Sequence, residues 1–260
     1  AARKVIDTLS LGFSCLEDLN DPFECTAFGF KDSEGSISTK TATDACRTRF
    51  SRKYGVLSLT RQPLNALMWS HYGDSHQGVV LGFDCDLAGF SDPKSNVIPN
   101  QYGEMIYSVT KPHNDLPVIG ENELMDIGGS LRFDSNAFNL MKRAFLYKSL
   151  EWAYEEEVRV VKNIGEIPFG YHTGGGRHRE CNKVTVSGRA LYCFDVPENS
   201  LKEIYLGRHL YRNVTKGGSV TDEELKGVLQ SWGKKDINMM QCEPDIHSWN
   251  LVAKPSINKS

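Results

Sequence analysis

The stretch Glu151–Lys162, EWAYEEEVRVVK, constrains the fold of this chain more than any other segment. It begins as a charged, helix-compatible run and ends in the β-branched residues typical of a strand. If the whole stretch is extended, Glu155, Glu157 and Arg159 share one face, because successive side chains of a strand alternate. Such a face suits a solvated sheet edge. It also suits a cleft in which Glu157 does chemistry, and the pattern alone leaves both interpretations open.

Composition is that of an ordinary soluble globular protein, with 40% hydrophobic and 24% charged residues among 260. The formal net charge of -3 gives no global reason to expect nucleic-acid binding. No apolar run approaches the roughly 20 residues of a membrane span. The seven cysteines include no Cys-x-x-Cys pair, which indicates reduced thiols. We therefore expect a cytoplasmic protein without a metal site and without membrane contact.

Hydrophobic periodicity predicts strands and helices in uneven alternation, with no linker between them. Strands are expected at 54–60, 78–84, 102–109, 184–186, 190–194, 201–206, 237–241 and 249–252. Helices are expected at 44–53, 63–72, 133–149 and 221–230. This order predicts an α+β fold with a mixed or largely antiparallel sheet and flanking helices. We expect a single domain over residues 1–260, with surface excursions at 31–43, 111–130 and 165–183.

The segment NDPFEC contains turn-forming residues near the start of the chain. Asn20 and Asp21 can bond their own backbone, and Pro22 fixes its backbone angle φ. One interpretation is the start of a helix with Asp21 as N-cap. The other is that Asn20, Asp21 or Glu24 lines a pocket.

The segment from Tyr54 to residue 84 predicts a strand, a helix and a second strand. The first strand ends in Ser58 and Thr60. The helix ends at His71 and Tyr72, just before the turn sequence GDSHQG. His71 can be a capping or core group, or it can belong to a site.

Several motifs in this order resemble a widespread bacterial domain family of unknown function. They are NDPFE, VLSLT followed by MWSHYGDSHQGVVLGF, KSLEWAYEEEVRVV, and LKEIYLG. The chain also resembles, more weakly, the ADP-ribosyltransferase superfamily. In its Arg–Ser–Glu branch one strand carries Ser-x-Ser/Thr and a later strand carries Glu-x-Glu. Here Ser58 and Thr60 match the first motif, and Glu155 and Glu157 match the second.

This second resemblance implies an ADP-ribosyltransferase-like fold and NAD as a substrate. Glu157 would bond the 2′-hydroxyl of the nicotinamide ribose and stabilise an oxocarbenium-like centre, while Glu155 would orient the acceptor. Ser58 would support Glu157, and Arg159 would offset the repulsion between the two carboxylates. Under this interpretation the NAD-contacting residues are Ser58, Thr60, His71, Tyr72, Arg159, Asn20 and Asp21. The acceptor would be a protein or a nucleic acid, and the setting a bacterial toxin or a phage-defence effector.

One part of that pattern has no clear counterpart. The superfamily expects an Arg or His on an early strand to hold NAD, and only Arg3 lies early enough unless the position precedes residue 1.

Two other classes of function stay open. A metal-dependent nuclease or hydrolase would need Asp21, Glu24, His71, Glu155 and Glu157 to converge, with Mg²⁺. A non-catalytic binding or sensor module would hold Glu157 in closed salt bridges with no adjacent pocket.

Overall fold

Two compact units make up the chain, each assembled from separate stretches of sequence. The computed structural model describes residues 2–31, 38–113, 115–116, 129–165, 176–178, 181–210, 227–228, 230–232 and 237–256. Unit 1 comprises Ala1–Leu9, Thr60–Ala88 and Pro197–Ser260, and unit 2 comprises Ser10–Leu59 and Gly89–Val196. The single domain expected over residues 1–260 stays a prediction.

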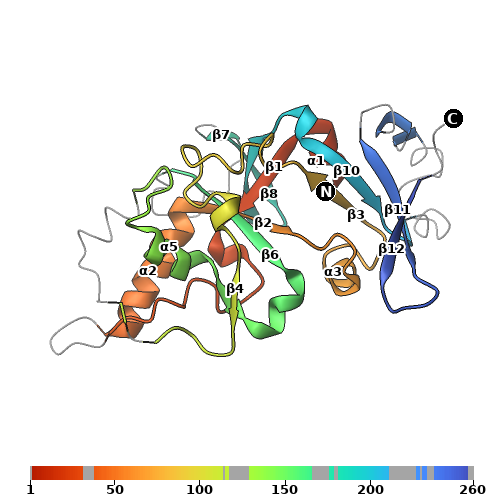
Figure 1. The fold of residues 1–260 in the computed structure, drawn as a ribbon. Coiled ribbons are helices and arrows are strands. Elements are labelled where there is room, and N and C mark those ends of the chain that lie inside the picture. The colour runs from red at the N-terminus through yellow and green to blue at the C-terminus, as the bar shows by residue number, and fades with distance from the viewer. Residues whose placement is uncertain are drawn as a thin grey trace. The chain divides into compact units, whose positions relative to one another are not determined.

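Unit 2 is built on a six-stranded sheet in the order β6-β2-β1-β9-β8-β7 (Figure 1). Its strands are β1 (Ser10–Ser14), β2 (Tyr54–Thr60), β6 (Glu157–Asn163), β7 (Gly176–His178), β8 (Cys181–Val186) and β9 (Arg189–Asp195). The pairs β1–β2, β1–β9, β7–β8 and β8–β9 are antiparallel. This order makes β2 the neighbour of β6, although some 100 residues separate them in the sequence.

Helices α2 (Thr39–Lys53) and α5 (Phe138–Phe145) supply much of the core of unit 2 and lie side by side (Figure 1). The ring of Phe50 lies 5.6 Å from that of Tyr54 and 5.8 Å from that of Phe145. Helix α2 begins earlier than the predicted residue 44 because the Ser38 side chain accepts a hydrogen bond from the N–H of Thr41 and caps it. The core therefore joins both helices to the sheet.

Strands β4 (Ile106–Ser108) and β5 (Tyr147–Ser149) pair in parallel to form a two-stranded ribbon. Strand β5 lies where the sequence predicted the end of a helix. The helix predicted over 133–149 spans only Phe138–Phe145, so both of its ends were wrongly predicted. Tyr147–Ser149 pairs with β4 instead of continuing the helix. Pairing with a distant strand thus overrides local helix periodicity here.

Unit 1 contains a mixed four-stranded sheet in the order β12-β11-β10-β3. Its strands are β3 (Val79–Phe83), β10 (Leu201–Leu206), β11 (Asn238–Pro244) and β12 (Leu251–Pro255). β10 and β11 are parallel, and the other two pairs are antiparallel. Helices α1 (Ala2–Thr8) and α3 (Ala66–His71) belong to this unit. The α+β class with mixed and antiparallel sheets is confirmed.

Residues 54–84, which were predicted as one strand–helix–strand block, contribute one strand to the sheet of each unit. Strand β2 belongs to the sheet of unit 2, whereas β3 belongs to that of unit 1. Four short 3₁₀ helices complete the described elements: η1 (Leu16–Asp18), η2 (Asn100–Tyr102), η3 (Leu150–Glu155) and η4 (Glu198–Ser200). Most of the predicted helix 221–230 and of the excursions 111–130 and 165–183 lies outside the described residues. Residues 39–43 of the first predicted excursion are helical.

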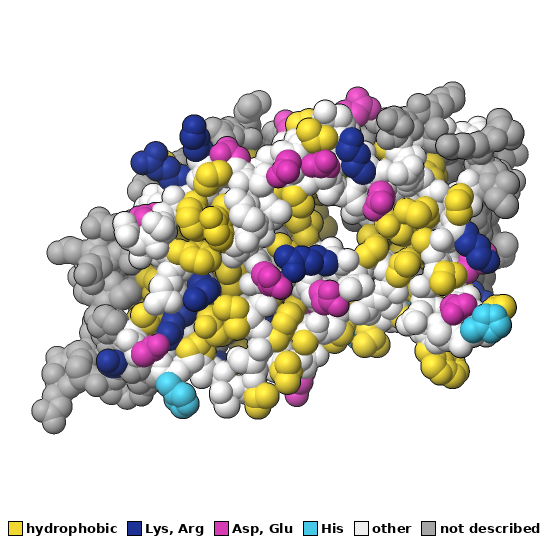
Figure 2. Space-filling view, viewed as in Figure 1, with side chains coloured by type: hydrophobic (Ala, Val, Ile, Leu, Met, Phe, Trp, Pro, Cys, Tyr) yellow, Lys and Arg dark blue, Asp and Glu magenta, His cyan; other side chains and the backbone are white. Residues whose placement is uncertain are grey.

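The described part of the chain contains no helix with the length and apolar character needed to cross a bilayer. Figure 2 shows acidic and basic side chains interspersed on the face in view, with no broad patch of a single sign. That distribution agrees with the small net charge of the sequence.

Candidate functional site

The stretch that begins at Glu151 is not one strand but a helix, a left-handed residue and a strand. Helix η3 ends at Glu155, Glu156 adopts a φ of 42°, and β6 begins at Glu157. The prediction that alternation places Glu155 and Glu157 on one face is therefore wrong, because the left-handed residue interrupts the alternation. Only Glu157 and Arg159 share a strand face in the predicted way.

Lys148 brings the two carboxylates together. Its Nζ donates to Oε2 of Glu155 over 2.6 Å and to Oε2 of Glu157 over 3.1 Å. The same ammonium lies 4.8 Å from the ring centroid of Trp152. A buried cation between two buried carboxylates removes much of their mutual repulsion.

Arg159 joins this group to a third carboxylate. Its Nε donates to Oε1 of Glu157 over 2.7 Å, and its Nη1 and Nη2 bind the two oxygens of Glu24. Nη1 also donates to the carbonyl oxygen of Phe145 over 2.7 Å. Arg159 therefore links β6, the segment after Asp21 and the end of α5.

We call Glu24, Lys148, Glu155, Glu157 and Arg159 the charge cluster. All five residues are buried, with exposed fractions from 1% for Arg159 to 7% for Lys148. Three carboxylates and two cations leave the ionised cluster with one net negative charge. Burial by itself would raise the pKa of Glu157, but the Arg159 charge, Lys148 and a hydrogen bond from Ser58 hold that pKa at about 2.

Two hydroxyl groups approach Glu157 from neighbouring strands. The side chain of Ser58, on β2, hydrogen-bonds to the Glu157 carboxylate, and Ser58 is itself exposed. The Tyr107 hydroxyl oxygen, on β4, accepts the backbone N–H of Glu157 over 2.9 Å. The structure thus brings together four residues that the sequence singled out, namely Ser58, Glu155, Glu157 and Arg159.

Sequence reasoning missed Lys148 and Tyr107, which are register partners in the β4–β5 ribbon. The available signal was weak: Lys148 lies only a few residues before Glu155 in KSLEWAYEEE, and a cation near two carboxylates is a natural partner. It was hidden by the prediction that residue 148 continues a helix.

The segment from Asn20 to Cys25 does not start a helix. Asp21 is buried and its Oδ1 accepts the N–H of Phe23 over 2.9 Å, which forms a turn, and Cys25 adopts a φ of 58°. The predicted helix start is therefore wrong, although Asp21 does bond the backbone. Asn20 is exposed, and in this segment Glu24 is the residue that reaches the charge cluster.

The other predicted NAD contacts lie in unit 1. His71 and Tyr72 are exposed at the end of α3, with ring centroids 6.3 Å apart. The Thr60 hydroxyl oxygen accepts the N–H of Gln62 over 3.0 Å, and exposed Arg3 pairs with Asp7 within α1. The assignment of His71 and Tyr72 as NAD contacts stays a prediction.

The chemistry of the charge cluster does not suit a divalent cation. Glu24, Glu155 and Glu157 do converge, but Arg159 and Lys148 already occupy the space between their oxygens. Among the described residues, no group of three or more His, Cys, Asp or Glu side chains is placed to hold a metal ion.

Fold and site together define an α+β protein with a buried, net anionic side-chain cluster at the start of β6. Over residues 68–160 the chain matches the model of a family described as "Protein of unknown function (DUF2971)". That stretch includes Lys148, Glu155, Glu157 and Arg159. Neither curated proteins nor solved structures give a match to the chain. The similarity to ADP-ribosyltransferases therefore stays a hypothesis.

Proposed function

We propose that this chain is an ADP-ribosyltransferase-like enzyme that cleaves the bond between nicotinamide and ribose in NAD, with Glu157 as its key carboxylate. The observation that carries the proposal is the hydrogen bond from Ser58 to Glu157 between the neighbouring strands β2 and β6. The resemblance assigns these two residues the same relationship.

The electrostatics of the charge cluster support this chemistry. Departure of nicotinamide with the bonding electron pair leaves positive charge on the ribose, and a fixed carboxylate stabilises that charge. With a pKa of about 2, Glu157 is ionised at neutral pH, and Lys148 and Arg159 hold it in place. The net negative charge of the cluster favours a cationic centre nearby. An acceptor oxygen or nitrogen then bonds to the ribose carbon and loses its proton to solvent.

A second function, that of a non-catalytic binding module, has its own supporting observation. Both oxygens of the Glu157 carboxylate already bind cations, and the side chain is only 5% exposed. If this arrangement persists with NAD present, the charge cluster stabilises the fold and does no chemistry.

Nicotinamide release from NAD, measured by chromatography, tests the proposal with water as the acceptor. We expect the wild type to release nicotinamide and Glu157→Gln to lose at least about 100-fold in rate. Glu155→Gln tests the second assigned role in the same cluster. It should reduce transfer to a protein or nucleic-acid acceptor more than it reduces NAD hydrolysis.

Circular dichroism must first show that both variants are folded. Equal rates in wild type and Glu157→Gln would overturn the assignment of Glu157. A wild type that neither releases nicotinamide nor gains thermal stability from NAD would favour the binding module. Nucleic-acid cleavage that EDTA abolishes would instead favour the metal-dependent nuclease.

The proposal also covers the acceptor, the location and the biological role. We propose a protein or nucleic acid as the acceptor and the bacterial cytoplasm as the location. The role would be that of a toxin or a phage-defence effector.

A further inference from the structure

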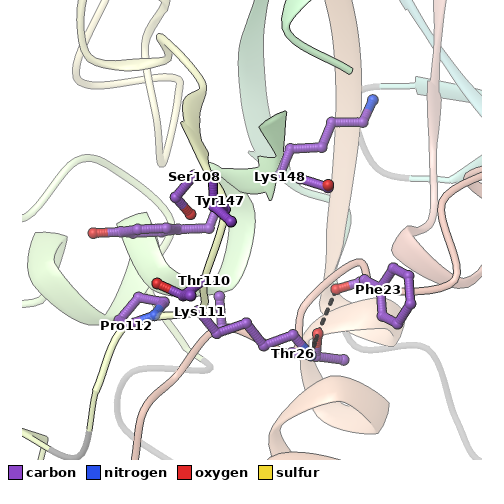
Figure 3. A pocket seen from close by; sticks show the side chains of 11 residues that line it. Phe23, Thr26, Ser108, Thr110, Lys111, Pro112, Tyr147 and Lys148 are labelled. Atoms are coloured by element: carbon purple, nitrogen blue, oxygen red, sulfur yellow. Dashed lines mark hydrogen bonds between the residues drawn. The ribbon is translucent and has the colours of Figure 1, made fainter. Parts of the chain in front are cut away.

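A cavity of about 200 Å³ in unit 2 lies beside the β4–β5 ribbon, and Lys148 of the charge cluster is one of the residues that line it (Figure 3). Its walls come from three segments: Phe23 with Thr26 and Ala27, the end of β4 with the residues that follow it, and β5. The volume is below the roughly 300–1,000 Å³ of sites for drug-sized ligands, so the cavity suits a single ring rather than a dinucleotide.

Lys148 of the β4–β5 ribbon borders the cavity, while its ammonium binds the carboxylates of the charge cluster. Register partners Tyr107 and Lys148 direct their polar ends to Glu157. The neighbouring partners Ser108 and Ser149 line the cavity. Figure 3 shows the amino end of Lys148 pointing away from the other labelled side chains. The Lys148 ammonium is therefore directed to the charge cluster, and neither Glu155 nor Glu157 lines the cavity.

The polar lining of the cavity favours an anion. None of the described residues that line it is acidic, and the ammonium of Lys148 is bound to Glu155 and Glu157. Lys111 carries the other positive charge in the lining, and its Nζ donates to Oγ1 of Thr26 over 2.8 Å. An ammonium has three donors, so the same group can also bind a carboxylate.

An aromatic ring lies next to this cation. Phe23 is 59% exposed, and its ring centroid lies 5.3 Å from Nζ of Lys111. Its backbone carbonyl accepts a hydrogen bond from the Thr26 hydroxyl over 2.5 Å, which ties the two residues of this wall together. An exposed aromatic side chain at the rim of a cavity is a typical ligand contact.

We propose that this cavity binds a small aromatic carboxylate, with the carboxylate on Lys111 and the ring against Phe23. The charge of Lys111, the absence of acidic groups from the described lining and the size of the cavity all select this class of ligand. The proposal does not depend on NAD cleavage, because Glu157 is not among the residues that line the cavity.

Benzoate and its neutral isostere benzamide are suitable probes, with binding followed by ligand-observed NMR at low ionic strength. We expect benzoate to bind at least about tenfold more tightly than benzamide, because a charge-assisted hydrogen bond is roughly twice as strong as a neutral one. Lys111→Gln should remove this preference, and Phe23→Ala should weaken both probes. Lys94→Gln, an exposed lysine outside the lining, is the matched control and should change nothing.

Three results would overturn the proposal: no benzoate binding at about 20 mM, equal binding of both probes, or an unchanged preference in Lys111→Gln. Thermal melting confirms that each variant is folded. Glu157→Gln should keep benzoate binding whether or not NAD is cleaved, so this test and that of the proposed function fail separately.

Discussion

Arg159 is the residue on which the charge cluster depends most. Its guanidinium is 1% exposed and binds two carboxylates and a backbone carbonyl. Arginine suits this position because its planar fork can bind a carboxylate through two parallel hydrogen bonds, as it does with Glu24. Removing a buried cation leaves its partners charged and unpaired, which costs more than the original pair contributes.

We therefore expect Arg159→Met, which keeps much of the side-chain volume, to lower the free energy of unfolding by about 3–5 kcal/mol. Urea denaturation followed by circular dichroism measures the change. Arg3→Met is the matched control, because the exposed pair between Arg3 and Asp7 should contribute at most about 1 kcal/mol. Similar small losses in both variants would show that the cluster contributes little to stability.

The ionic character of the site could be predicted from the sequence, but the pairing of its charged side chains could not. Two short motifs and the strand pattern after them pointed to Ser58, Glu155, Glu157 and Arg159. These four residues do lie together. Lys148 could not be derived, because it reaches Glu157 through a parallel pairing between segments about 40 residues apart. Local periodicity carries no information about such pairings.

The junction between η3 and β6 decides how Glu155 and Glu157 meet. Glu156 occupies the left-handed region with a φ of 42°, which costs a non-glycine residue roughly 1–2 kcal/mol. That conformation turns the chain so that Glu155 on the helix and Glu157 on the strand both reach Lys148. The strand continues as predicted only beyond this residue.

A comparison of Glu156→Gly with Glu156→Ala isolates this backbone effect, because both variants lose the side chain. We expect the glycine variant to be more stable by about 1 kcal/mol, since glycine adopts positive φ without steric cost. Thermal melting, monitored by circular dichroism, measures the difference. An alanine variant as stable as the glycine variant would mean that residue 156 leaves the left-handed region in solution.

Element positions were predictable where a strand or helix depends on its own sequence pattern. Strand β2 has its predicted bounds, and α5 lies within its predicted range, with Leu140, Met141, Ala144 and Phe145 buried. The error at Tyr147–Ser149 falls where pairing with a distant strand decides, because a short strand gains most of its stability from its partner. The error before Glu157 has a different cause, namely the left-handed residue Glu156, which ends η3 and interrupts the strand pattern.

At the scale of the whole molecule, the chain passes repeatedly between its two units. Unit 2 receives Ser10–Leu59 and Gly89–Val196, and the intervening segment Thr60–Ala88 belongs to unit 1. The crossing between Leu59 and Thr60 falls inside strand β2, so no linker marks it in the sequence. The α+β class could be predicted from the alternation of patterns, but the division into units could not.

Each unit contains a group whose pKa ties its stability to pH. In unit 1, His76 stacks 6.2 Å from Trp69, and burial, then His209 and Arg208, hold its pKa below the usual 6.5. In unit 2, the pKa of Glu157 is about 2 rather than 4.5. In both cases the folded state binds fewer protons than the unfolded state, so stability falls as pH falls.

We expect two separate pH windows of acid destabilisation. The contribution of His76 is complete above pH 6.5 and is lost as pH falls toward its lowered pKa, whereas that of Glu157 is complete above pH 4.5 and is lost toward about pH 2. Urea midpoints measured between pH 7.5 and pH 3, roughly one unit apart, resolve both windows. His76→Asn should remove the loss of stability in the His76 window and leave the Glu157 window unchanged. Glu157→Gln should remove the loss in the Glu157 window and leave the His76 window unchanged. His113→Asn, at an exposed position, should leave both unchanged. A first window that persists in His76→Asn would assign it to another group.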